Sequence, residues 1–209
     1  MISHKYRTIF VHIPKTGGQS VENVFLALHG LTWETREPLL LRPNKDREIG
    51  PAQLAHLRAK EYVACGHIDQ AAFDSYFKFA FVRNPWDRLV SGFHYYAKRG
   101  EKAGVTFPQY VQRVCTRGYK TRAHDRPLVD FLLDEDGRML VDFVGRFENF
   151  ADDFGKVCDR LQLGEQQLPH VNKGGGSRKR YQEYYDDRLR DLVAQTFAAD
   201  IQRFGYTFD

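Results

Sequence analysis

The stretch that decides the fold is "IFVHIPKTGGQSVENVFLAL", residues 9–28. Residues 6–12 are rich in β-branched and aromatic side chains, and Pro14 ends the run, which predicts a buried strand. Two glycines follow, and apolar residues then recur at helical spacing through residues 20–28. A strand, a glycine turn and a helix in this order are the opening of an α/β unit.

The same alternation continues along the chain. "YVACGH" (62–67) and "FKFAFVRN" (77–84) predict two more strands, and residues 139–150 predict a fourth. Asn84 is suited to cap the following helix, with Pro85 at its first position. Helical patterns cover residues 51–60, 69–76, 85–99, 107–116, 127–133, 150–161 and 186–204. We therefore expect an α/β protein with a P-loop-like three-layer fold, in which helices flank a mainly parallel central sheet.

Composition narrows the class of protein. The 209 residues are 42% hydrophobic and 28% charged, as is ordinary for a globular protein, and no linker divides them, so we expect a single domain over residues 1–209. We expect no membrane span and, without a signal-like N-terminus, a cytoplasmic location. A net charge of +4 is too small to indicate nucleic acid as a partner. The cysteines form no CxxC pair and no Asp/Glu/His cluster stands out, so we predict no metal.

The first loop has the chemistry of an anion site. Backbone N–H groups at a strand-to-helix turn and the dipole of the helix together attract anions. Gly17 and Gly18 allow close approach of a ligand, Thr16 and Ser20 offer hydroxyl groups, and Lys15 offers a positive charge. The lysine precedes the glycines, unlike the order in the ATP-binding GxxxxGK[ST] loop. The alternative interpretation is a tight turn with an exposed lysine.

A second stretch, "FAFVRNPWDRLVSGF" (79–93), has features of a second phosphate site. Arg83 lies where a predicted strand ends, which is where open α/β sheets place ligands. Ser91 lies on the second turn of the next helix, and its side chain leans toward the N-terminus of that helix. A guanidinium and a hydroxyl suit a phosphate group. In the alternative interpretation, Arg83 and Arg88 form structural ion pairs with Asp87 or other carboxylates.

Taken together, "FVHIPKTGGQS" (10–20) and "FVRNPWDRLVSGF" (81–93) resemble the carbohydrate sulfotransferases of the membrane-type and bacterial family, including the glycosaminoglycan 2-O-sulfotransferases. "CGH", "VGRFENF", "LPHVNKG" and "DIQRFGYTF" are similar to further landmarks of that family, so the resemblance covers nearly the whole chain. It implies transfer of a sulfuryl group from 3′-phosphoadenosine 5′-phosphosulfate (PAPS) to a hydroxyl group of an acceptor, most simply a carbohydrate or glycoconjugate.

The resemblance also implies the binding residues. The first motif would contact the 5′-phosphosulfate through Lys15, Thr16, Gly17, Gly18, Gln19 and Ser20. Arg83 and Ser91 would hold the 3′-phosphate, and Lys173 and Arg178 would come from a late basic loop that closes over the nucleotide. Gln19 departs from the pattern, since a hydroxyl residue is commoner there, but its amide can still donate a hydrogen bond.

Two residues are predicted to be catalytic. Lys15 would stabilise the negative charge on the departing phosphate oxygen. His67 would accept the proton of the acceptor, because it follows the predicted strand at residues 62–65, at the carboxyl edge of the sheet, and histidine titrates in a suitable range. The related 2-O-sulfotransferases place a histidine in a similar Gly-His segment. The other candidates for the base are His12, His170, His94 and Glu148.

Two other functions compete with sulfuryl transfer. A nucleotide-dependent kinase of similar fold would also bind phosphates, but the GK[ST] order and an evident Mg²⁺-binding carboxylate are missing from the sequence. A non-catalytic protein that binds nucleotides or anionic glycans would keep Arg83 and Ser91 without needing Lys15 or His67. The sequence does not define the acceptor beyond a hydroxyl group.

Overall fold

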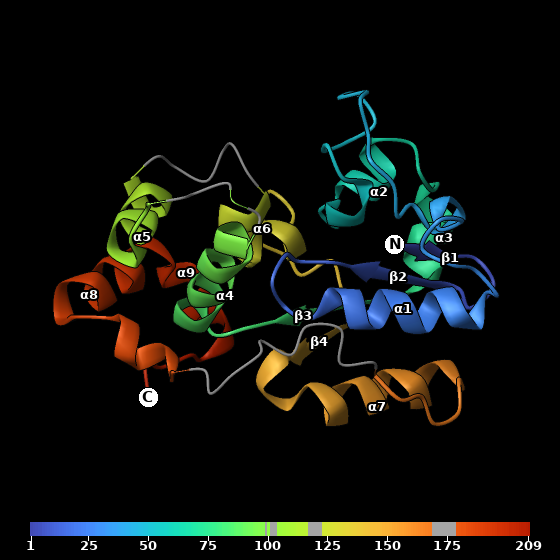
Figure 1. Ribbon diagram of the computed structural model, residues 1–209. Helices are drawn as coiled ribbons and strands as arrows, with labels where there is room; N and C mark the ends of the chain where they lie inside the picture. Colours follow the sequence, from blue (N-terminus) through green and yellow to red (C-terminus); the bar gives the residue numbers. More distant parts are fainter. Residues whose placement is uncertain (99, 101–103, 117–122, 169–178) are drawn as a thin grey trace. The chain divides into compact units, whose positions relative to one another are not determined.

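The computed structural model describes residues 1–98, 100, 104–116, 123–168 and 179–209 (Figure 1). The chain forms two compact units, each built from two segments. The first unit comprises Met1–Val82 and Asp130–Asn172, and the second comprises Arg83–Val129 and Lys173–Asp209. The expectation of a single domain stays a prediction.

The first unit is built on a four-stranded sheet in the order β1-β2-β3-β4. The strands are β1 (Ile2–Ser3), β2 (Thr8–Val11), β3 (Phe77–Val82) and β4 (Phe143–Arg146). β1 runs antiparallel to β2, whereas β2, β3 and β4 are parallel, with Phe10 opposite Phe79 and Phe79 opposite Phe143. The predicted mainly parallel sheet is confirmed, and the short β1 is an element that the sequence pattern did not indicate.

Helices cover both faces of this sheet (Figure 1). On one face, α1 (Gly18–Leu28) and α7 (Phe150–Leu161) share an apolar core with the strands. That core includes Phe10, Phe79 and Phe81 of the sheet, Val21 and Phe25 of α1, and Phe154 and Val157 of α7. On the other face lie α2 (Glu61–Ala64) and α3 (Gln70–Ser75). The α/β class is thereby confirmed.

The strand predicted at residues 62–67 is wrong. This segment begins with the helix α2, whose Tyr62 is buried and donates its hydroxyl to the carbonyl oxygen of Phe10 at 3.0 Å. The carboxylate of Glu61 accepts from the backbone N–H of Arg58 at 2.7 Å, which stabilises the start of the helix. A short apolar run such as "YVAC" fits a strand and a buried helical turn equally well, so its periodicity could not decide between them. The helix predicted at 51–60 is likewise reduced to one 3₁₀ turn, η2 (Leu54–His56).

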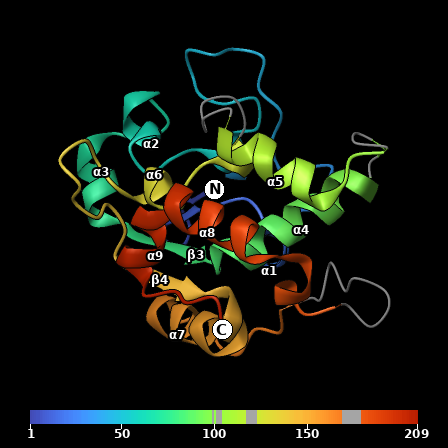
Figure 2. The same cartoon turned by 90° about the vertical axis from the view of Figure 1, so that its left-hand side faces the viewer.

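The second unit is helical (Figure 2). It contains α4 (Pro85–Lys98), α5 (Phe107–Thr116), α8 (Asp187–Thr196) and α9 (Ala198–Phe204), with the 3₁₀ turns η3 (Ala123–Asp125) and η5 (Tyr181–Tyr184). Asn84 caps α4 as predicted, accepting from the N–H of Trp86 at 3.1 Å. The helix predicted at 186–204 is interrupted at Phe197, a buried residue with φ −108° and ψ 28°.

The remaining elements are short. η1 (Glu37–Leu39) and η4 (Phe147–Asn149) belong to the first unit, and α6 (Val129–Leu132) crosses the boundary between the units. Across the residues that are described, no helix combines the length and the apolar character needed to traverse a bilayer.

A buried carboxylate organises the second unit. Asp200 of α9 has no exposed surface, and its two oxygens accept from the N–H groups of Leu128 and Val129 at 2.8 and 2.9 Å. Arg88 of α4 is also buried and donates to the carbonyl oxygens of Arg126 and His124. Burial lowers the pKa of Arg88, and the charge of Asp200 opposes that shift. Asp200 therefore ties the last helix to the start of α6.

Replacing Asp200 should destabilise the protein. In Asp200→Asn, an amide N–H₂ replaces one accepting oxygen and leaves a buried backbone N–H without its partner, so we expect the free energy of unfolding to fall by about 2–3 kcal/mol. Urea unfolding followed by circular dichroism measures this. Asp191→Asn is the matched control, because the exposed Asp191 pairs only at the surface with Arg190; its effect should stay within about 0.5 kcal/mol. Equal effects of the two variants would contradict the role of Asp200.

Candidate functional site

The loop between β2 and α1 presents the N-terminus of a helix. Gly17 is the N-cap of α1, with φ 87°, and its carbonyl oxygen accepts from the N–H of Ser20 at 2.9 Å. The first turn of α1 carries no acidic side chain, so no carboxylate there neutralises the positive end of the helix dipole. Lys15 adds a positive charge to the same loop. This arrangement can bind an anion.

Lys15 has an uncommon backbone conformation. Its φ is 72°, in the left-handed region that side-chain-bearing residues rarely adopt. Such a conformation costs about 1–3 kcal/mol and persists only where the surrounding structure enforces it. Residues of this kind gather at binding and catalytic sites, so the strain at Lys15 agrees with the function predicted for the loop.

Packing inside the protein requires both glycines of the loop. A Cβ atom on Gly17 would lie 2.9 Å from the ring of Phe150 and 3.2 Å from that of Phe147. A Cβ atom on Gly18 would lie 2.1 Å from Cδ2 of His12. The sequence argument assigned these glycines to the close approach of a ligand, whereas the structure shows that protein rings already fill the space a Cβ would take.

The other residues of the loop differ in what they can offer a ligand. Thr16 is fully buried, and its hydroxyl donates to the carbonyl oxygen of Ile13 at 2.8 Å. Its side chain therefore braces the loop, and the backbone is the part of Thr16 suited to an anion. Gln19 is exposed, and Ser20 and Lys15 are half-buried. The structure thus brings residues 15–20 together in one loop, as the sequence predicts.

A buried His–Glu pair lies behind this loop. Nδ1 of His12 is 2.6 Å from Oε1 of Glu22, and both side chains are buried. Burial by itself would raise the pKa of Glu22, but the charge and the hydrogen bond of His12 hold that pKa below its usual value. His56 packs against His12 and donates from Nδ1 to its backbone oxygen at 3.1 Å. Burial, with the charge of His12, lowers the pKa of His56 to about 3.

The sequence interpretation missed Glu22 and His56. Glu22 falls on the same face of α1 as Gly18, since the two residues are four positions apart. The sequence did contain a signal for Glu22, because it is a charged residue on the face of α1 that is expected to be buried. His56 lies within the stretch predicted to be helical, residues 51–60, and nothing in its neighbourhood marks it.

Arg83 and Ser91 belong to the second unit. Arg83 is buried, and its Nε and Nη2 lie 2.8 and 2.7 Å from Oδ2 of Asp87. The ion pair considered as the alternative interpretation is therefore present. Ser91 is half-buried and lies four residues beyond Asp87, on the same side of α4.

His67 does not follow a strand as predicted, because the segment before it forms the helix α2. His67 is half-buried, and its Nε2 donates to the carbonyl oxygen of Ile49 at 2.7 Å. His67 does not extend from an edge of the sheet, and its assignment as the base stays a prediction that rests on the family resemblance. If neutral, its ring keeps Nδ1 as the accepting nitrogen.

The remaining candidates are scattered. Nε2 of His94 is hydrogen-bonded to the hydroxyl of Tyr184 at 2.9 Å in the second unit. Glu148 is exposed on η4, beside the phenylalanines that contact Gly17. Lys173, Arg178 and His170 lie outside the described residues. Among the residues whose placement is described, no three His, Cys, Asp or Glu side chains gather in a way that could hold a metal ion.

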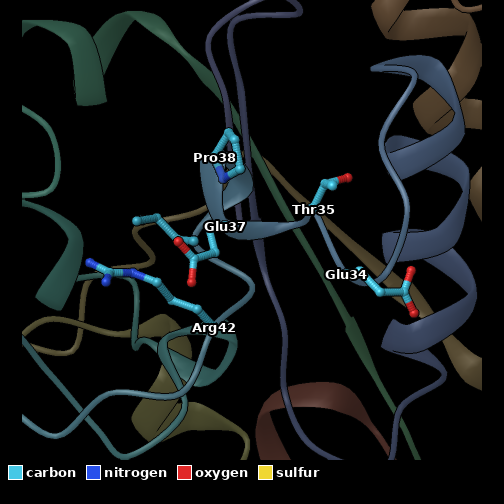
Figure 3. A pocket seen from close by; sticks show the side chains of 6 residues that line it. Glu34, Thr35, Glu37, Pro38 and Arg42 are labelled. Atoms are coloured by element: carbon cyan, nitrogen blue, oxygen red, sulfur yellow. The ribbon is translucent and has the colours of Figure 1, made fainter.

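A pocket of about 480 Å³ follows α1 in the first unit (Figure 3). Its walls combine two carboxylates, one guanidinium, one hydroxyl and apolar groups: Glu34, Thr35, Glu37, Pro38, Leu40 and Arg42. Its lining residues follow the C-terminal end of α1 in the sequence, and none of them belongs to the loop of residues 15–20. It contains none of the residues predicted to bind or react.

Comparison with known proteins adds an independent observation. The model of the sulfotransferase family matches residues 1–207. Carbohydrate sulfotransferase 14 of Homo sapiens is 26% identical over 200 residues, which cover 82% of this chain and 47% of that protein. The Mus musculus protein of the same name gives the same identity and coverage. The chain therefore spans about half the length of these two relatives.

An uncharacterized protein of Archaeoglobus fulgidus is 27% identical over 106 residues, or 50% of this chain and 83% of that protein. No solved structure matches this chain.

The contact between Gly18 and His12 can be tested directly. In Gly18→Ala the added methyl group overlaps the imidazole, so we expect the free energy of unfolding to fall by about 1–3 kcal/mol. Gly155→Ala is the control, because Gly155 is a helical glycine of α7 with nothing within 4 Å of its Cβ position. The free energy of unfolding of Gly155→Ala should rise by about 0.5–1 kcal/mol. Urea unfolding of both variants provides the measurement, and an unchanged stability of Gly18→Ala would show that the ring is not held against the glycine.

Proposed function

Since this chain belongs to the sulfotransferase family, we propose that it transfers a sulfuryl group from PAPS to a hydroxyl group of a carbohydrate or glycoconjugate. One observation carries the proposal: Lys15, in a strained backbone conformation, lies two residues before the N-cap of a helix whose first turn has no acidic side chain. This combination suits the phosphosulfate end of the donor.

The two motifs would bind opposite ends of the donor. The loop of residues 15–20 would contact the 5′-phosphosulfate through backbone N–H groups and Lys15. Arg83 and Ser91 would contact the 3′-phosphate. In this protein Arg83 also pairs with Asp87, which holds the guanidinium at the start of α4.

The proposed reaction is a direct transfer. An oxygen of the acceptor forms a bond to sulfur while the bond between sulfur and the bridging oxygen breaks, and the electron pair of that bond remains on the departing phosphate. Lys15 stabilises the resulting negative charge. His67 is the proposed base that accepts the proton of the acceptor hydroxyl. Because a cationic side chain carries the charge, we predict that no metal is needed.

A carbohydrate acceptor is the finer part of the proposal. It is supported by the similarity to proteins named carbohydrate sulfotransferase 14 and by the motifs of the carbohydrate sulfotransferase family. A glycan or glycoconjugate supplies the hydroxyl group that the reaction requires.

The donor site predicts a specific pattern of nucleotide binding. Adenosine 3′,5′-bisphosphate, at about 100 times its dissociation constant, should stabilise the wild type by about 2.7 kcal/mol in a thermal shift assay, and ATP with Mg²⁺ should do less. In Arg83→Ala, binding of the bisphosphate should be weakened by about 1.5–3 kcal/mol of binding free energy, because a charged hydrogen-bond donor is lost. Affinity for 5′-AMP, which lacks the 3′-phosphate, should hardly change.

Arg188→Ala is the control for that experiment, because Arg188 is exposed on α8. A larger shift with ATP and Mg²⁺ than with the bisphosphate would favour a kinase. If Arg83→Ala lost the same amount of affinity for the bisphosphate and for 5′-AMP, the assignment of Arg83 to the 3′-phosphate would be wrong.

Lys15 should matter for the reaction more than for binding. We expect Lys15→Ala to lower the rate of sulfuryl transfer by about 10²–10³-fold, as for loss of one group that stabilises a developing negative charge. Transfer from radiolabelled PAPS to a panel of glycans measures this, with the exposed Lys5→Ala as control. His67→Ala should also lose transfer, and full activity in that variant would exclude His67 as the base. A wild type that binds the bisphosphate but sulfates no acceptor would favour the non-catalytic binder.

A further inference from the structure

We propose that His12 and Glu22 form a positioning pair, in which Glu22 orients the imidazole of His12 and the imidazole holds the first turn of α1 in place behind the Lys15 loop. The inference rests on the proposed function, because it assigns the pair to the 5′ end of the donor site. It concerns two residues that touch neither the donor nor the acceptor in the proposed reaction.

The geometry of the pair joins both ends of the loop. His12 directly follows β2 and is the residue at which the chain enters the loop. Its ring occupies the Cβ position of Gly18, the first residue of α1: the ideal Cβ atom would be 2.1 Å from Cδ2 and 2.2 Å from Nε2. The ring therefore links the residue before the loop to the residue after it.

Glu22 fixes the orientation of that ring. A carboxylate can only accept a hydrogen bond, so the proton lies on Nδ1 of His12 and the opposite edge of the ring, Cδ2 and Nε2, faces Gly18. Because Gly18 and Glu22 are one helical turn apart, the imidazole lies along a single face of α1. The hydrogen bond of 2.6 Å to Glu22 and the contact with Gly18 thus hold the same turn of the helix.

His56 supports His12 from the other side. It donates to the backbone oxygen of His12, and the two rings meet edge to face with their centroids 4.6 Å apart. The main chain and the side chain of His12 are therefore both held. With Nδ1 bonded to Glu22 and the opposite edge packed on Gly18, His12 is suited to position the loop and not to accept a proton from an acceptor.

Binding of two nucleotides tests the inference. His12→Asn keeps an N–H donor near the Nδ1 position and removes the ring edge that packs on Gly18. We expect it to bind adenosine 3′,5′-bisphosphate about tenfold more weakly, equivalent to about 1.4 kcal/mol and typical of coupled side chains. Binding of adenosine 3′-phosphate, which has no group at the 5′ position, should not change. Isothermal titration calorimetry measures both dissociation constants.

Glu22→Gln is the second variant, and it keeps the shape of the side chain. It should weaken binding of the bisphosphate by a smaller factor than His12→Asn, again without affecting adenosine 3′-phosphate. The double variant should bind no more weakly than His12→Asn alone, because Glu22 acts through His12. His29→Asn is the control: His29 also bonds a side chain, Ser3 at 2.8 Å, but it lies just beyond the C-terminal end of α1.

Three results would overturn the inference. They are unchanged binding of the bisphosphate in His12→Asn, equal weakening of both nucleotides, and additive effects in the double variant. If the wild type binds neither nucleotide, the proposed function fails and this inference fails with it. If the wild type binds both and the variants bind as the wild type does, only the inference fails.

Discussion

The close contact between Gly18 and His12 is the constraint on which the first unit depends. A side chain at position 18 would occupy the space of the imidazole, and the imidazole in turn is fixed by Glu22 on the same helix. The helix α1 can therefore begin only where it does, directly after a turn through two residues with positive φ, Lys15 and Gly17. The helix N-terminus and the lysine charge come together as a result of this packing.

The rings of Phe147 and Phe150 complete the support of the loop. They cover the Cβ position of Gly17, so the turn that follows β4 and the turn that follows β2 contact each other. "VGRFENF", which resembles a family landmark, thus has a physical role in this protein: its phenylalanines form a wall of the loop. Asp153 of α7 reinforces that wall by accepting from the N–H of Arg146 at 2.8 Å.

The sequence predicted the parts of the fold in which pattern and length agree. β3, α4, α5 and α7 lie within a few residues of their predicted positions, because each combines an apolar periodicity with a clear start, such as Asn84 and Pro85 before α4. The strand predicted at 62–67 is wrong because a run of four apolar residues is too short to distinguish a strand from a helix. The helix forms because the Tyr62 hydroxyl and the Glu61 carboxylate make hydrogen bonds to neighbouring segments. The single helix predicted at 186–204 is wrong because the chain breaks at Phe197, whose burial depends on tertiary packing that the local sequence does not show.

The sequence indicated the loop of residues 15–20 as a binding site, but not the side chains that hold this loop in place. Lys15, the glycines and Arg83 belong to short motifs that can be recognised without coordinates. Glu22 and His56 reach His12 from other elements, and only the folded chain shows those contacts. The pairing of Arg83 with Asp87 was one of two interpretations, and four-residue spacing alone does not decide between an ion pair and a phosphate ligand.

The order in which the two units use the chain has a consequence for biosynthesis. β4 and α7 belong to the first unit, yet they are translated only after the segment Arg83–Val129 of the second unit. When Val82 leaves the ribosome, the edge of β3 that will pair with β4 is unpaired, and the face of Phe79 and Phe81 lacks α7, one of the two helices that cover it. The nascent chain must carry this exposed apolar edge until residues 143–161 emerge, and no continuous fragment of the sequence contains either unit by itself.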